Sequence, residues 1–216
     1  MMNWKLAIKD QRQMQLKAIQ AQLVKTKIIP DWMEVKIIKF CDKYRLDQNS
    51  VDLIKQRLIT GDLVTICQFM KEPLKQNFSE KYLFNHLKNH CRITKLAPNG
   101  VNAYYLIDHQ IQTNLKSKPI GLKSLDFKIV INQQTYFLVH KLINESGGAQ
   151  DQQFNEIVNL IKGLDKNSAK QIIFVCDGEY FHATKIAKLT NLVDFKIHIY
   201  TTLDLQAQLE LLGELT

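Results

Sequence analysis

The sequence predicts a mixed α+β protein, in which a helical amino-terminal half precedes an α/β carboxy-terminal half. Up to about residue 90, apolar residues recur at the three- and four-residue spacing of amphipathic helices. Beyond about residue 115, β-prone runs alternate with helical patterns, which is typical of a sheet with helices on its faces. The charge changes as well: residues 1–110 carry 18 Lys and Arg against 10 Asp and Glu, and residues 111–216 carry 11 of each. We therefore expect two regions, residues 1–112 and 113–216.

The composition is that of an ordinary globular protein. Of the 216 residues, 45% are hydrophobic and 23% are charged, which excludes a disordered chain. The longest apolar runs, such as Ile172–Cys176, are far shorter than the ~20 residues of a membrane span, so no membrane partner is expected. Met1–Lys5 lacks the apolar run of a signal peptide, which predicts a cytoplasmic protein. The cysteines have neither zinc-site nor disulfide spacing and are expected to be free thiols: Cys41, Cys67, Cys91 and Cys176.

Five helices are expected in the first region. Pro30 ends the first helical pattern and Pro73 ends the fourth, because proline cannot continue a helix. Asn49 or Ser50 is expected to cap the third helix, and Asp62 to cap the fourth. The expected helices are residues 1–27, 32–44, 51–61, 63–70 and 80–90.

A β-hairpin is expected after the last of these helices. Arg92–Ala97 and Val101–Ile107 are β-prone, and an Asn-Gly pair lies between them, which is a strong hairpin signal. Two helices, a polar basic helix and then a hairpin follow the order of a winged helix-turn-helix domain. In such domains the last helix before the wing enters the major groove of DNA. The sequence therefore predicts a winged-helix DNA-recognition region within residues 1–112.

Amide and basic side chains around this helix and hairpin are the candidate DNA contacts. Amides and amines can read base edges, whereas lysine and arginine bind phosphates. The excess positive charge of this half agrees with double-stranded DNA as a partner. The alternative is a helical region that packs against another part of the protein, with these residues solvated. The candidates for base edges are Asn85, Lys88 and Asn89, and those for phosphates are Lys81, Arg92 and Lys95.

The second region predicts a mixed sheet with helices on its faces. Residues 132–134 are expected to turn the chain between the first two strands, and a loop with two glycines, Asn144–Gly148, precedes the first helix. Asp177 follows a fully apolar strand and is expected to be a turn residue. The expected strands are residues 126–131, 135–141, 171–176 and 195–200, and the expected helices are residues 150–164, 180–189 and 203–212.

Asp126 begins the first strand of a predicted hairpin, and Lys141 ends the second strand. A carboxylate at the start of one strand, a hairpin, and a lysine near the end of the next strand resemble the PD-(D/E)xK nuclease superfamily, and more narrowly its type II restriction endonucleases. Leu125-Asp126-Phe127 corresponds to the first motif, and Val139-His140-Lys141 to the second. Two further segments, Asn144–Glu156 and Phe174–Gly178, are similar to segments of restriction enzymes with this core. The resemblance covers roughly residues 115–202.

The resemblance implies a restriction-modification enzyme that cleaves double-stranded DNA at specific sequences, using Mg²⁺ and no small-molecule cofactor. Asp126 would bind the metal, and Lys141 would orient the attacking water and stabilise charge on the phosphate. Cleavage of both strands of a symmetric site would imply a homodimer. The alternatives are a non-catalytic DNA-binding protein, such as a regulator or an inactivated nuclease, and a protein whose basic half binds an acidic partner.

Val139 occupies the position where the family has its second acidic residue, and valine cannot bind a metal. Three explanations remain open. The acidic ligand has moved to Glu156 in the following helix or to Glu145 in the loop; position 139 has been substituted, with loss of activity; or the resemblance is accidental. The candidate catalytic residues are therefore Asp126, Lys141, Glu156 and Glu145, with Asp126 and Glu156 as metal ligands.

Three further polar residues lie near these motifs. Gln150 and Gln152 follow the Gly-Gly loop, and their amides suit contacts with phosphate or adenine, although a solvated helix start has the same composition. His140 is adjacent to Lys141 in a strand, so the two side chains should point to opposite faces. We expect His140 to be a partly buried or surface histidine.

Overall fold

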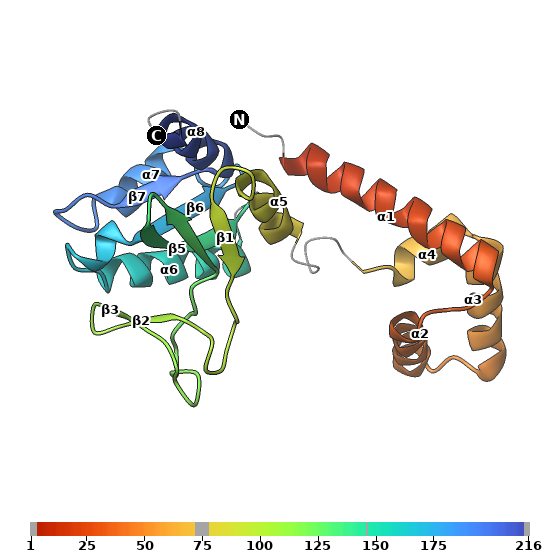
Figure 1. The fold of residues 1–216 in the computed structure, drawn as a ribbon. Coiled ribbons are helices and arrows are strands. Elements are labelled where there is room, and N and C mark those ends of the chain that lie inside the picture. Colours follow the sequence, from red (N-terminus) through yellow and green to blue (C-terminus); the bar gives the residue numbers. More distant parts are fainter. Residues whose placement is uncertain (1–3, 72–77, 146, 214–216) are drawn as a thin grey trace. The chain divides into compact units, whose positions relative to one another are not determined.

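The computed structural model describes residues 4–71, 78–145 and 147–213 (Figure 1). The chain forms two compact units: Trp4–Phe78, here called the helical unit, and Ser79–Thr216, here called the sheet unit. This division differs from the predicted boundary between residues 112 and 113. Residues 79–112 belong to the sheet unit, because a strand at Arg92–Lys95 pairs with one at Phe127–Ile131. Among the described helices, none combines the length and the apolar character needed to cross a bilayer.

In the described part of the helical unit, four helices lie at the places where the sequence predicts them. Asp62 caps the fourth helix as predicted, since its carboxylate accepts a hydrogen bond from a backbone N–H at 2.9 Å. Asp47, rather than Asn49 or Ser50, caps the third helix: its carboxylate accepts from the backbone N–H of Ser50 at 2.9 Å. The helices are α1 (Trp4–Thr26), α2 (Asp31–Tyr44), α3 (Gln48–Thr60) and α4 (Leu63–Phe69). Their shared core consists of Leu23, Met33, Ile37, Cys41, Leu58, Ile66 and Phe69.

A five-stranded mixed sheet, in the order β1-β4-β5-β6-β7, organises the sheet unit. β4 is antiparallel to β1 and β5, whereas β6 is parallel to β5 and β7. This confirms the predicted mixed sheet. The strands are β1 (Arg92–Lys95), β4 (Phe127–Ile131), β5 (Gln134–Leu142), β6 (Ile172–Asp177) and β7 (His198–Tyr200), with β2 (Tyr105–Ile107) and β3 (Gln110–Gln112) in a separate hairpin. The helices are α5 (Phe78–Leu87), α6 (Gly148–Lys162), α7 (Ala183–Thr190) and α8 (Thr202–Gly213), with a short 3₁₀ helix at Ser168–Lys170.

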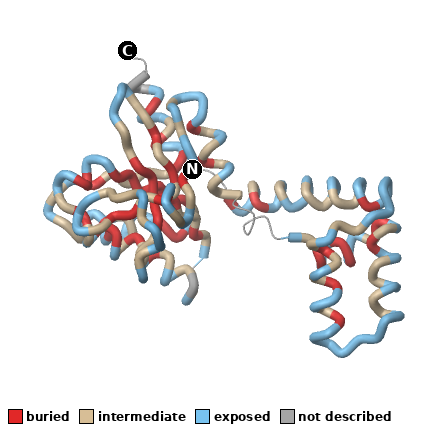
Figure 2. Tube along the Cα trace, turned by 60° about the horizontal axis from the view of Figure 1, so that its bottom comes forward, coloured by how far each residue is buried: buried red, intermediate tan, exposed pale blue. Residues whose placement is uncertain are grey.

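Helices cover both faces of this sheet, and Figure 2 shows buried residues gathered along its strands. α6 and α7 pack on one face, here called the α6 face, where Val139 and Phe174 are buried. α5 and α8 pack on the other, here called the α8 face, where Leu138 and Val175 are buried. Because successive strand residues point to opposite sides, β5 contributes alternately to the two cores.

The predicted wing hairpin around the Asn-Gly pair is wrong. β1 pairs antiparallel with β4, and β2 pairs with β3. Because β1 joins the five-stranded sheet, Ile93 packs against the core of the α8 face. Leu96, just after β1, lies in the core of the α6 face. The observed hairpin turns at Asp108 and His109, whose φ angles of 48° and 64° suit a two-residue turn between strands. The winged-helix arrangement predicted for residues 1–112 therefore lacks its wing.

Candidate active site

Asp126 lies immediately before β4 and is bound to β5. Its backbone N–H donates to the carbonyl oxygen of Leu138 at 2.9 Å. Its carboxylate oxygen Oδ2 accepts from the backbone N–H of His140 at 2.8 Å and from the amine of Lys123 at 3.0 Å. These bonds fix the carboxylate beside the segment of β5 that contains Val139.

Lys141 follows Val139 by two residues on β5, so both side chains point to the α6 face. The Lys141 amine donates a hydrogen bond to Oε2 of Glu156, which lies on α6. The side chain of Lys141 is 12% exposed and that of Glu156 is 39% exposed, so the pair lies at the edge of the core. Together with the Lys123–Asp126 pair, these residues are called the carboxylate–lysine cluster: Lys123, Asp126, Lys141 and Glu156.

The electrostatic environment of Lys141 reflects all members of this cluster. Burial of the amine, followed by the positive charge of Lys123, lowers the pKa of Lys141 below that of an ordinary lysine. The hydrogen bond and charge of Glu156 act in the opposite direction on this pKa, as does the charge of Asp126. The pKa of Lys141 thus depends on both carboxylates and on the other lysine of the cluster.

Two substitutions are expected to move the pKa of Lys141 in opposite directions. Lys123→Met removes a positive charge and should raise it, whereas Glu156→Gln removes a negative charge and should lower it further. An NMR titration of the lysine side chains would measure both shifts. If the Lys141 amine titrated at the same pH in all three proteins, the proximity of these charges would be refuted.

The cluster contains two carboxylates, the ligand type that Mg²⁺ prefers in proteins. Such ions are commonly bound by one or two carboxylates together with water and phosphate oxygens. Among the described residues, Oδ1 of Asp126 and Oε1 of Glu156 accept no hydrogen bond, while Oδ2 and Oε2 are held by lysines. The described part of the chain contains no group of three or more His, Cys, Asp and Glu side chains placed to hold a metal. A metal ion at the cluster would take its remaining ligands from water or from a phosphate.

Glu145 and Glu156, the two candidates for the missing carboxylate, lie in different surroundings. Glu145 is exposed in the loop after β5, whereas Glu156 contacts Lys141. Val139 is only 1% exposed and packs in the core of the α6 face. The structure thus places a helix carboxylate next to Lys141, two residues after Val139.

His140 and Asp177 lie on the α8 face, away from the cluster. His140 points away from Lys141 as expected, and it is buried, with its Nε2 3.0 Å from Oδ2 of Asp177. Thr202 completes the group, because its backbone N–H and its hydroxyl both donate to the Asp177 carboxylate, at 3.0 and 2.6 Å. The expectation that Asp177 is a turn residue is wrong: it is the buried last residue of β6. Gly178 then turns the chain with φ 101°, where a Cβ would lie 2.2 Å from a backbone oxygen.

Three of the candidate DNA contacts line one hollow of the sheet unit. Lys81 and Asn85 of α5 and Lys95 of β1 surround a pocket of about 410 Å³, together with Phe84. The Lys95 amine also pairs with the carboxylate of Glu80 at 2.6 Å. The pairing of β1 with β4, rather than a wing, brings Lys95 next to α5.

The remaining candidate DNA contacts are separate from that hollow. Lys88, Asn89 and Arg92 are exposed in and just after the turn that links α5 to β1. Gln150 is half-buried and Gln152 is exposed, and both lie near the start of α6, outside the carboxylate–lysine cluster. The structure therefore distributes these residues over three places: the hollow, the turn after α5 and the start of α6.

Lys123 is the member of the cluster that the sequence motifs do not single out. It lies three residues before Asp126, outside the predicted strand, and its amine binds the Asp126 carboxylate. In the sequence, Lys123 is marked only by its position three residues before Asp126. Nothing in that spacing alone distinguishes it from a solvated lysine.

Comparison of this chain with protein-family models, with curated proteins and with solved structures finds no match. Its function must therefore be inferred from its residues and their arrangement.

Proposed function

We propose that this chain is a Mg²⁺-dependent endonuclease for double-stranded DNA, of the type II restriction class and related to the PD-(D/E)xK nucleases. The observation that carries the proposal is the convergence of Asp126, Lys141 and Glu156 from three separate elements. Lys141 and Glu156 are 15 residues apart in the sequence, yet their side chains are hydrogen-bonded. The resemblance in the sequence implies the same residue types for metal binding and for the positioning of water.

The cluster offers the groups that phosphodiester hydrolysis needs. A bound Mg²⁺ ion supplies an activated water and neutralises charge on the attacked phosphate. Asp126 and Glu156 would hold it through the carboxylate oxygens that the lysines leave free. Lys141, whose amine is already directed at a metal ligand, would donate a hydrogen bond to the attacking water or to a phosphate oxygen.

The helical unit would supply most of the attraction to DNA. Residues 4–78 carry 14 Lys and Arg against 8 Asp and Glu, whereas residues 79–216 carry 15 against 13. Contacts between basic side chains and phosphates dominate the affinity of proteins for DNA. Recognition of a symmetric target would require a homodimer in which each protomer contributes one cluster. The proposed contacts of the sheet unit with the duplex are Lys81, Asn85, Lys88, Asn89, Arg92, Lys95, Gln150 and Gln152.

A non-catalytic DNA-binding protein is the second candidate function. Val139 favours a non-catalytic protein, because valine adds no carboxylate to the cluster. The two carboxylates that the cluster has are each paired with a lysine. Such pairs can serve as a structural ion network without binding a metal. DNA affinity would be retained in that case, and divalent ions would not produce cleavage.

A plasmid-nicking assay separates these candidates. The nuclease proposal expects nicked and linear plasmid in Mg²⁺ and none in EDTA. Tight, salt-dependent binding in a gel shift without cleavage in Mg²⁺ or Mn²⁺ would support the non-catalytic protein instead. Absence of DNA binding even at low salt would contradict both and favour an acidic protein partner.

A further inference from the structure

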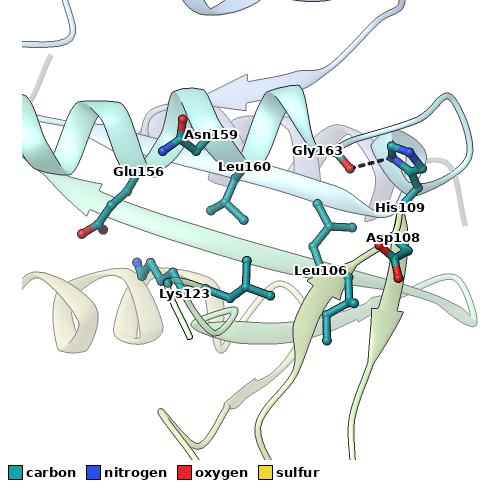
Figure 3. A pocket seen from close by; sticks show the side chains of 11 residues that line it. Leu106, Asp108, His109, Lys123, Glu156, Asn159, Leu160 and Gly163 are labelled. Carbon is teal, nitrogen blue, oxygen red and sulfur yellow. Dashed lines mark hydrogen bonds between the residues drawn. The ribbon is translucent and has the colours of Figure 1, made fainter. Parts of the chain in front are cut away.

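A pocket of about 370 Å³ opens beside the carboxylate–lysine cluster, within the sheet unit (Figure 3). One side of it is a single face of α6, since its lining residues there recur at three- and four-residue spacing. The other side is formed by the β2–β3 hairpin and by residues 121–123. The pocket shares Lys123 and Glu156 with the cluster, so a molecule in the pocket would lie next to the proposed metal ligands.

The middle of this pocket is apolar and its ends are polar. Figure 3 shows Lys123 and Glu156 at one end, and His109 at the other. Asn159, one helical turn after Glu156, also lines the pocket, and its amide carries both donors and an acceptor. Between the ends, the walls are leucine side chains: Leu106, Leu122 and Leu160.

His109 is hydrogen-bonded to the residue that follows α6, at its end of the pocket. Its Nδ1 lies 2.9 Å from the carbonyl oxygen of Gly163. A carbonyl oxygen only accepts, so Nδ1 of His109 carries a proton and donates in this bond. The bond joins the β2–β3 hairpin to the end of α6, so the two sides of the pocket are linked at this end.

We propose that this pocket binds the base and sugar of one unpaired nucleotide, whose phosphate lies at the carboxylate–lysine cluster. The inference rests on the proposed function and adds to it a site for the nucleotide next to the cleaved bond. A heterocyclic base would lie between the leucines, with its polar edge toward Asn159 and its phosphate toward Lys123. The volume falls within the ~300–1,000 Å³ of small-molecule sites. Enzymes that extrude a nucleotide from a duplex hold its base in a pocket of the protein.

The test is calorimetric binding of 2′-deoxynucleoside 5′-monophosphates in the presence of Mg²⁺, with inorganic phosphate for comparison. We expect at least one mononucleotide to bind more tightly than phosphate. Asn159→Ala should weaken that binding about three- to tenfold, the effect of one lost hydrogen bond. Asn155→Ala is the matched control, since both asparagines are exposed on α6 and Asn155 does not line the pocket. Asn159→Trp, which fills the pocket, should abolish binding, whereas Asn155→Trp should preserve it.

Two results would overturn the proposal: no mononucleotide binds better than phosphate, or the Asn155 and Asn159 variants weaken binding equally. A short single-stranded oligonucleotide distinguishes a nucleotide within a strand from a free one. If the oligonucleotide binds more tightly than the mononucleotide, and this binding is lost in Asn159→Trp, the pocket takes a nucleotide that is part of a strand. Equal binding of the oligonucleotide and the mononucleotide would contradict that conclusion. Nucleotide binding without DNA cleavage would refute the nuclease activity and support the nucleotide pocket. DNA cleavage without nucleotide binding would refute the nucleotide pocket and support the nuclease.

Discussion

Replacing Asp126 with alanine is expected to slow Mg²⁺-dependent DNA cleavage about a thousandfold, because it removes one of the two proposed metal ligands. Glu156→Gln should produce a loss of the same order, since it keeps the shape of the side chain and removes its charge. Lys141→Ala should also abolish cleavage while DNA binding is retained. Initial rates of plasmid nicking at saturating Mg²⁺ would measure these losses, and a gel shift would show that DNA affinity is preserved.

Glu145→Gln is the matched control for Glu156→Gln. Glu145 is exposed in the loop after β5, so its charge should not matter and cleavage should continue at the unchanged rate. Equal losses in the two glutamine variants would refute the assignment of Glu156 as a ligand. Cleavage unaffected by Asp126→Ala or by Lys141→Ala would refute the role given to that residue.

Replacing Asp177 with alanine is expected to lower the free energy of unfolding by about 3–5 kcal/mol, as the loss of one partner from a buried pair typically does. The carboxylate accepts three hydrogen bonds, from His140 and Thr202, and the side chains of both Asp177 and His140 are almost fully buried. Its loss would strand the imidazole and the hydroxyl without a partner in the core of the α8 face. Urea unfolding followed by circular dichroism would measure the change.

Asp204→Ala provides the control for this loss of stability. Asp204 also accepts hydrogen bonds, from the backbone N–H and the hydroxyl of Thr201, but it is exposed. Its removal should cost about 1 kcal/mol, as for other exposed caps. A loss for Asp177→Ala no larger than that for Asp204→Ala would contradict a stabilising role for the buried group.

The strand pair that carries Asp126 and Lys141 was predictable because local signals specify it. β-prone residues flank a short polar turn, and Asn132 and Gln133 adopt the positive φ angles, 48° and 66°, of a tight hairpin. The following helix could be predicted from its apolar spacing, and that spacing placed Glu156 within reach of the strand end. The local pattern thus contained most of the candidate site.

The partner of β1 could not be predicted from local pattern. The Asn-Gly signal near residue 100 describes a turn preference, and Gly100 does adopt φ 79°, but it does not decide which strands pair. Ile93 and Leu96 gain burial only when β1 joins β4, a contact between segments over thirty residues apart. For the same reason the buried position of Asp177 could not be predicted: its partners His140 and Thr202 are 37 and 25 residues away.

The alternation of β5 has a consequence for errors in folding. Lys141 faces α6 and its neighbour His140 faces Asp177, so a slip of one residue in the pairing of β5 would exchange their places. The imidazole would then enter the carboxylate–lysine cluster, and the long lysine side chain would be forced into the tightly packed interior beside Asp177. Misalignment would therefore be penalised on both sides of the sheet at once. The polar residues of β5 therefore favour a single pairing register of this strand.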